Sequence, residues 1–218
     1  MTTIQMNIKL IRTNFALPGR VIYLDVVDDV EALITDLSEA DLVPCWAEIW
    51  PSARTLARYI WSNLFLQGQS VLELGSGLGL PGVVCGVRGA HVTFSDYNEE
   101  AVKLSLHNAG LNDVCAQGFI GDWRTFGLQE RFDIILGSDI FYDPQLNPYL
   151  MRICRNNLLP GGQLLLSHQR RQHTYAFVEC LQVTLGLTET RIDSIEKDEE
   201  SVFGHFAVSM HHLQPRIS

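Results

Sequence analysis

Three glycines after a short apolar segment form the clearest ligand-binding motif of the chain. Residues 71–79 read Val-Leu-Glu-Leu-Gly-Ser-Gly-Leu-Gly, so Gly75, Gly77 and Gly79 stand at alternate positions and Ser76 separates the first two. Glycine lets the backbone turn sharply and exposes main-chain atoms that a side chain would cover. We therefore predict that these four residues bind a cofactor where a buried strand ends and a helix begins.

The residues around this loop indicate a ribose and disfavour a dinucleotide. Asp96 ends the next expected strand, where a carboxylate can accept both hydroxyls of a ribose. A dinucleotide motif needs glycine or alanine at position 80, where this chain has Leu80. Glu73, two residues before Gly75, suits a cationic ammonium group or ribose hydroxyls better than a pyrophosphate. A nicotinamide dinucleotide is therefore the weaker alternative.

An acidic and an aromatic residue follow the third expected strand. Asp122 and Trp123 can hold an adenine, because the carboxylate can accept its exocyclic amine and the indole can pack against its ring. A tryptophan packed in the core beside an aspartate in a turn explains the same pair equally well. Both interpretations stay open at this point.

Ser138, Asp139 and Tyr142 follow the fourth expected strand, at the edge of the sheet where a reacting group would arrive. A direct displacement needs alignment, a neutral nucleophile and exclusion of water, and it needs no covalent intermediate. Asp139 and Tyr142 can orient an amine, and Asp139 can help that amine lose its proton. The alternative is an aspartate in a turn beside a packed tyrosine.

The order of expected strands and helices brings these residues to one edge of a sheet. We expect a Rossmann-like, doubly wound, mostly parallel seven-stranded sheet with an antiparallel C-terminal hairpin and an N-terminal hairpin and helix extension. The expected strands of the sheet are residues 70–74, 91–95, 114–119, 132–138, 163–167, 188–195 and 202–211. The expected helices start at Pro51 and at about Pro81 and cover residues 99–108, 146–158 and 174–185. The extension comprises a hairpin of residues 5–13 and 20–26 and a short helix over 30–37.

Length and composition indicate one globular enzyme domain. The 218 residues are enough for a single domain over 1–218, with the extension in 1–44 and the cofactor-binding core in 45–218. No apolar run is long enough to span a bilayer, and the first residues lack the apolar segment of a signal peptide. Five cysteines without metal-ligand spacing predict reduced thiols, no metal site and a cytoplasmic protein. The net charge of −9 disfavours nucleic acid and favours a basic protein surface or a cationic small molecule.

Three sequence features together carry a resemblance to a known family. They are Trp50-Pro51-Ser52-Ala53 before the first core strand, the Glu-Leu-Gly-Ser-Gly-Leu-Gly loop, and Asp139-Ile140-Phe141-Tyr142, which matches a DxxY motif. Residues 46–171 resemble the class I, seven-β-strand methyltransferases that use S-adenosylmethionine (SAM). Within them they resemble the methyltransferase-like branch that contains many protein lysine methyltransferases.

The resemblance implies a role for each candidate residue. It implies that Glu73, Gly75 and Gly77 hold the methionine and ribose parts of SAM and that Asp96 binds the ribose hydroxyls. It further implies that Trp123 lines the adenine pocket, Trp50 covers the cofactor, Ser138 lies against it, and Asp139 and Tyr142 face the substrate. It also implies that the last strand inserts antiparallel beside the fifth.

Several alternatives remain at this stage. The lysine acceptor leads, because an arginine acceptor has a pKa above about 12 and usually needs more than one acidic residue. A small-molecule N-methyltransferase and a non-catalytic module that binds SAM or a partner stay as rival functions. We expect His168 to be a hydrogen-bonded rim residue, His211 and His212 to be solvated, and Trp46 and Trp61 to serve packing.

Overall fold

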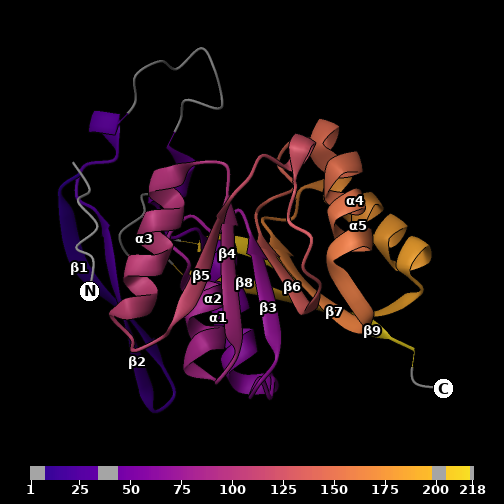
Figure 1. Ribbon diagram of the computed structural model, residues 1–218, viewed down its shortest axis with the longest axis horizontal. Helices are drawn as coiled ribbons and strands as arrows, with labels where there is room; N and C mark the ends of the chain where they lie inside the picture. Colours follow the sequence, from indigo (N-terminus) through magenta and orange to yellow (C-terminus); the bar gives the residue numbers. More distant parts are fainter. Residues whose placement is uncertain (1–7, 34–43, 198–204, 217–218) are drawn as a thin grey trace.

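A seven-stranded sheet forms the centre of the chain and confirms the expected fold class (Figure 1). The computed structural model describes residues 8–33, 44–197 and 205–216. The strand order is β5-β4-β3-β6-β7-β9-β8; the first five of these strands are parallel, and β9 runs antiparallel to both β7 and β8. The strands are β3 (Ser70–Leu74), β4 (His91–Asp96), β5 (Ala116–Ile120), β6 (Phe132–Ser138), β7 (Leu158–His168), β8 (Leu187–Lys197) and β9 (His205–Pro215). The insertion of the last strand beside β7 is therefore as expected.

Helices cover both faces of the sheet. α1 (Pro51–Asn63), α2 (Leu80–Val87) and α3 (Glu99–Gly110) pack on one face, and α4 (Asn147–Asn157) and α5 (Gln172–Leu185) pack on the other (Figure 1). Side chains alternate along each strand, so Val71 joins the first core and Leu72 the second. Because the parallel strands are buried on both faces, they read as continuous apolar segments in the sequence.

The N-terminal hairpin is present but displaced from its expected position. β1 (Leu10–Leu17) pairs antiparallel with β2 (Arg20–Val27) across the two-residue turn Pro18-Gly19, in which Gly19 has a φ of 74°. The end expected for the first strand at residue 13 is wrong, because the tight turn continues the pairing up to Leu17. Of the helix expected over 30–37, the structure has a 3₁₀ turn, Glu31–Leu33; residues 34–37, like 1–7, lie outside the described residues.

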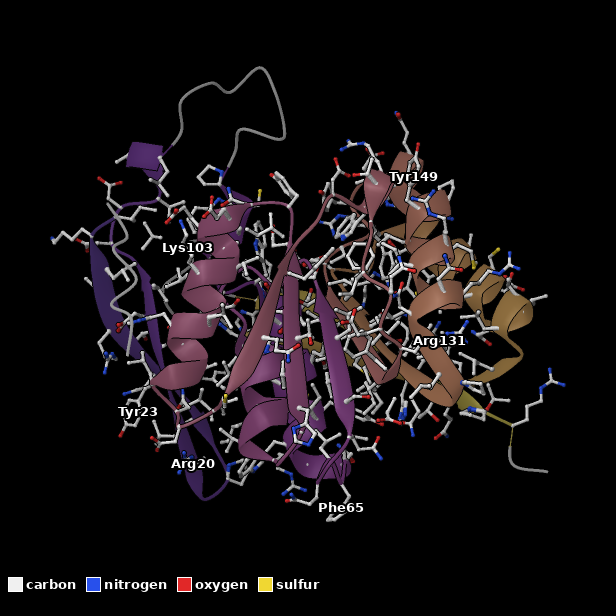
Figure 2. The ribbon with its side chains drawn as sticks, in the orientation of Figure 1. Arg20, Tyr23, Phe65, Lys103, Arg131 and Tyr149 are labelled. Carbon is white, nitrogen blue, oxygen red and sulfur yellow. The ribbon has the colours of Figure 1, made fainter. Side chains whose placement is uncertain are left out.

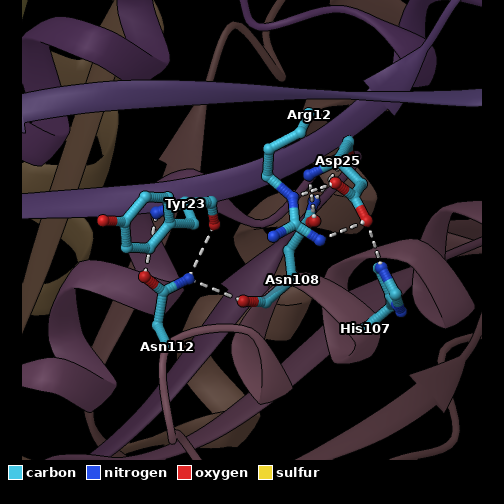
Figure 3. Close-up of polar contacts among 6 residues, drawn as sticks. All are labelled: Arg12, Tyr23, Asp25, His107, Asn108 and Asn112. Atoms are coloured by element: carbon cyan, nitrogen blue, oxygen red, sulfur yellow. Dashed lines mark hydrogen bonds and ion pairs between the residues drawn. The ribbon is translucent and has the colours of Figure 1, made fainter.

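Two asparagines, Asn108 in α3 and Asn112 just after its end, fix the hairpin to the domain (Figure 3). Asn112 accepts a hydrogen bond from the main-chain N–H of Tyr23 at 2.9 Å and donates to its carbonyl at 2.7 Å. Asn108 accepts from the N–H of Asp25 at 2.8 Å, and the Asp25 carboxylate pairs with Arg12 and contacts His107 Nε2 at 2.7 Å. These side chains satisfy main-chain groups along β2 that would otherwise be left open at a strand edge.

Strand β7 begins five residues before the strand expected over 163–167. It includes Pro160-Gly161-Gly162, and its pairing with β6 shifts between Phe132 and Ile134. Gly161 has a φ of 83°, so glycine suits this irregularity. Across the described residues, no helix combines the length and apolar character that a bilayer crossing requires.

Candidate active site

A cavity of roughly 310 Å³ opens at the carboxyl ends of β3, β4 and β6. This edge of the sheet lies at the top of Figure 1, and the amino ends lie near Phe65 at the lower edge of Figure 2. The segment before α1 closes one side of the cavity, so the wall that covers the site comes from residues 45–50 and not from the hairpin strands. The predicted site residues that line the cavity are Trp50, Gly75, Ser76, Gly77, Gly79, Asp96, Asp122, Trp123, Ser138, Asp139 and Tyr142.

The glycine loop is packed so tightly that side chains would not fit. Gly75, Gly77 and Gly79 have φ values of 60°, 49° and 77°, in the left-handed region that favours glycine. A Cβ on Gly77 would lie 2.9 Å from the carbonyl oxygen of Trp46. Trp46, expected to serve packing alone, therefore also forms part of the cavity wall.

Asp96 combines burial with spare hydrogen-bonding capacity. It is 5% exposed, and its two carboxylate oxygens accept from the main-chain N–H groups of Gly77 at 3.1 Å and Asn98 at 3.0 Å. Burial raises the pKa of this carboxyl, and the N–H groups oppose the rise. Because a carboxylate has about four acceptor positions, Asp96 can still accept ribose hydroxyls.

Asp122 and Trp123, which follow β5, lie together at the cavity. Asp122 caps the 3₁₀ turn Trp123–Thr125 by accepting from the N–H of Arg124 at 2.8 Å, and it also pairs with the guanidinium of Arg124 at 3.0 Å. The indole of Trp123 lies 3.3 Å from the position of a Cβ on Gly75. Arg152 donates to the carbonyls of Trp123 at 3.2 Å and Arg124 at 2.7 Å, which ties this turn to α4. An adenine can pack beside Trp123, and the Asp122 carboxylate, which accepts two hydrogen bonds from Arg124, keeps acceptor positions for the exocyclic amine.

Glu73 lies away from the cavity, contrary to expectation. It follows Val71 by two residues and therefore points to the same face of β3, under α2, where it accepts from the N–H of Gly82 at 2.9 Å. Its side chain is 1% exposed, and burial, with a contribution from the charge of Asp96, raises its pKa to about 8. In the structure Glu73 therefore contacts the junction of the loop and α2, and its contact with the cofactor stays a prediction.

Glu73→Gln is expected to remove a loss of stability at alkaline pH. The folded chain keeps the proton of Glu73 up to about pH 8, whereas the unfolded chain loses it near pH 4.5, so stability falls as pH rises between these values. Glutamine keeps the acceptor for the N–H of Gly82 and does not ionise. At pH 9 we therefore expect the free energy of unfolding of the variant to exceed that of wild type by about 4 kcal/mol. Urea titrations at pH 6 and pH 9 measure this, with the exposed Glu130→Gln as control. An equal alkaline loss in Glu73→Gln would contradict the assignment.

Asp139 lies at the cavity with its carboxylate fully engaged. It follows β6 in a left-handed conformation with a φ of 54°. Its oxygens accept from Ser52 Oγ at 2.7 Å, from Gln169 Nε2 at 3.1 Å and the Gln169 N–H at 3.3 Å, and from Arg171 in an ion pair. The predicted site residues did not include Ser52, Gln169 or Arg171, although Ser52 belongs to the tryptophan-proline motif. Tyr142, 49% exposed, lies at the cavity mouth.

The expectations for the histidines are wrong. His168 and His211 are 0% exposed, and His212 is 7% exposed, because β9, which carries His211 and His212, is an inner strand of the sheet and pairs with both β7 and β8. The Nε2 atoms of His168 and His211 lie 2.8 Å apart, and Nδ1 of His211 pairs with Glu189. His211 therefore donates to Glu189 and accepts from His168 when both rings are neutral.

His168→Gln is expected to reduce the acid sensitivity of the fold. Burial, and then the neighbouring His211, lower the pKa of His168 to about 4 from its ordinary 6.5. The unfolded chain takes up this proton first, so stability is lost as pH falls from 6.5 to 4, by about 2–3 kcal/mol. Glutamine can place its amide nitrogen near the position of Nε2 without titrating. Urea titrations at pH 7 and pH 4.5 should show a smaller loss than in wild type or in the exposed control His91→Gln; an unchanged loss would contradict the prediction.

Comparison with known proteins decides the family. A family described as lysine methyltransferase matches residues 30–183, from the 3₁₀ turn after the hairpin into α5. The chain belongs to this family.

The names of similar proteins refer to different acceptor side chains: histidine, arginine and lysine. The chain is 35% identical over 153 residues to the histidine protein methyltransferase 1 homolog of Dictyostelium discoideum, covering 65% of this chain and 48% of that protein. It is 28% identical to the histone-arginine methyltransferase METTL23 of Xenopus laevis, covering 78% and 77%, and 30% identical to the EEF1A lysine methyltransferase 3 of Mus musculus, covering 57% and 56%. The chain spans about half the length of several of the relatives that it matches.

Solved structures support the fold of the family. The 16S rRNA N2 G1207 methyltransferase of T. thermophilus superposes with a TM-score of 0.65 at 17% identity, covering 95% of this chain and 51% of that chain. The N-methyltransferase NodS of Bradyrhizobium japonicum superposes with a TM-score of 0.58 at 17% identity, covering 86% and 97%. At these identities the likeness concerns the fold alone.

Proposed function

We propose that the chain is a SAM-dependent N-methyltransferase that modifies a protein side chain, with the ε-amine of lysine as the acceptor. The observation that carries the proposal is the pairing of the glycine loop with Asp96 in one cavity, in a member of a lysine methyltransferase family. When bound, SAM supplies a methyl group on a positively charged sulfur. The residues of this chain then have to bind SAM, align the acceptor nitrogen with the methyl group and exclude water.

The cavity residues divide into a cofactor side and an acceptor side. Asp96 accepts the ribose hydroxyls, the loop of Gly75 and Gly77 exposes main-chain atoms to the ligand, and Trp123 and Trp50 pack beside the adenine and cover it. Ser138 lies against the cofactor, and Tyr142 faces the acceptor, where alignment and the exclusion of water favour direct displacement. No covalent enzyme intermediate is required.

The charges in the cavity favour lysine over arginine. A guanidinium must lose a proton with a pKa above about 12, which calls for free carboxylates beside it. Of the four carboxylates that line the cavity, Asp122 pairs with Arg124, Asp139 pairs with Arg171 and Asp96 belongs to the ribose side. That leaves Glu48, a single acidic residue where an arginine acceptor usually needs more than one. The net charge of −9 further favours a basic partner.

The rim of the cavity supports a protein substrate. Tyr97 and Tyr142 line the cavity and are 50% and 49% exposed, so aromatic surface is available to a macromolecule at the mouth. A small-molecule acceptor would not need this exposed surface. We also place the protein in the cytoplasm, because its five cysteines are free thiols, three of them exposed.

Transfer of a radiolabelled methyl group tests the proposed function. The purified protein is incubated with SAM labelled in its methyl group and with a cell lysate treated with nucleases, and the labelled protein is hydrolysed for amino-acid analysis. Methyllysine is the expected product. Methylhistidine or methylarginine would show that the acceptor is histidine or arginine and not lysine. Label found only in small molecules would support the rival small-molecule N-methyltransferase. If folded protein binds SAM but transfers no label, the enzyme assignment is wrong.

A further inference from the structure

Four donors from two separate parts of the chain converge on one carboxylate. Ser52 belongs to the first turn of α1, Gln169 follows β7 and contributes two N–H groups, and Arg171 stands at the start of α5. All of them bind Asp139, which is buried apart from about 9% of its side chain. These segments meet only at the carboxyl edge of the sheet, so the cluster is a product of the fold.

The carboxylate of Asp139 has no acceptor position left for a substrate proton. An ionised carboxylate offers about four lone-pair positions, and these four donors occupy that number. The guanidinium of Arg171 stays protonated under all ordinary conditions, so the pair is neutral as a unit. An acceptor amine could reach Asp139 only if one of the donors left.

The same cluster controls the turn that forms the reactive side of the cavity. The N–H of Asp139 donates to the carbonyl of Ser167 at 2.8 Å, and the residue is held at a φ of 54°, a conformation that a non-glycine residue adopts at a cost. Ile140 follows directly, and its Cγ2 lies 3.0 Å from the position of a Cβ on Gly75. Movement of this turn would therefore move Ile140 against the cofactor loop and Tyr142 at the cavity mouth.

We propose that Arg171 is a positioning residue that, with Gln169 and Ser52, holds Asp139 and thereby fixes the turn from Asp139 to Tyr142. Asp139 then does not take the proton of the acceptor, and the acceptor nitrogen enters the cavity already neutral. The first part concerns the fold of this chain; the second part rests on the proposed methyl transfer.

Hydrogen exchange tests the positioning role without a substrate. In Arg171→Gln we expect exchange at the amides of Asp139 and Tyr142 to speed up about tenfold, because the strained turn loses its strongest partner. Arg171→Lys, which keeps the charge, should show a smaller increase, and Arg170→Gln, which removes the neighbouring exposed arginine, should show none. Unchanged exchange at Asp139 in Arg171→Gln, in protein that unfolds like wild type, would overturn the positioning role.

A pair of substitutions tests whether Asp139 acts as a base. The assay is methyl transfer from labelled SAM to the lysate proteins that the wild type modifies. Asp139→Asn should reduce the rate at least about 30-fold, because it leaves the Arg171 cation unpaired, and adding Arg171→Gln should restore it to within about fivefold of wild type. The restored variant should also show the pH dependence of the wild type, set by the acceptor.

The outcomes separate this inference from the proposed function. If the double variant stays as inactive as Asp139→Asn while the wild type is active, Asp139 supplies more than position and the neutral-acceptor part is wrong. If the wild type binds SAM but transfers no methyl group, the proposed function fails, and the hydrogen-exchange result still decides the role of Arg171.

Discussion

Asp96→Asn is expected to weaken SAM binding by at least about 100-fold, and Asp96→Ala to abolish it. Asparagine keeps the shape of the side chain but loses the charge and one acceptor, and charge-assisted hydrogen bonds contribute about 1.5–3 kcal/mol each. In the structure these acceptors face both the cavity and the N–H of Gly77, so the ribose site and the loop weaken together. Calorimetric titration with SAM measures the effect.

The matched control is Asp113→Asn. Asp113 is exposed, lies at a φ of 61° after α3 and is not among the cavity residues, so the same chemical change should leave the affinity unaltered. Thermal unfolding of both variants separates a lost ligand contact from a lost fold. Wild-type affinity in a folded Asp96→Ala variant would remove Asp96 from the ribose site.

Gly77→Ala is expected to abolish detectable SAM binding. A Cβ at this position would lie 2.9 Å from a main-chain oxygen of Trp46, which cannot turn away as a flexible side chain can, and the φ of 49° is unfavourable for alanine. The loop or the wall around Trp46 must therefore shift, with a loss of stability of about 1–3 kcal/mol.

Gly110→Ala provides the comparison for that substitution. A Cβ on Gly110, at the end of α3, would meet no atom within 4 Å, so binding should be unchanged. Calorimetry and urea unfolding on both variants measure the two effects. A Gly77→Ala variant that binds SAM as tightly as wild type would show that the close approach of the Trp46 segment is not needed.

The sequence predicted the sheet well because each central strand carries a local pattern. Ser70–Leu74 and Phe132–Ser138 have the bounds that we expected, since continuous apolar segments bounded by polar or glycine residues define buried parallel strands. The bounds of the hairpin were predicted less accurately, because the alternation of polar and apolar residues does not show where the pairing stops before Pro18-Gly19.

Positions that depend on local sequence could be predicted, and contacts that depend on long-range packing could not. Asp96 and Tyr142 lie at the cavity because they end or follow strands of known direction. The Asp139 cluster joins Ser52 to Arg171, two residues far apart in the chain, so spacing could not have revealed it. The direction of the Glu73 side chain could have been predicted from the sequence, because residues two apart on a strand share a face and Val71 faces α2.

Calorimetric titration of the purified protein with SAM, with its demethylated product and with NAD tests cofactor binding directly. We expect micromolar binding of SAM and of the product and no binding of NAD, because the cavity combines a glycine loop followed by Leu80 with a ribose-binding Asp96. Folded protein that binds neither SAM nor its product would contradict the central claim.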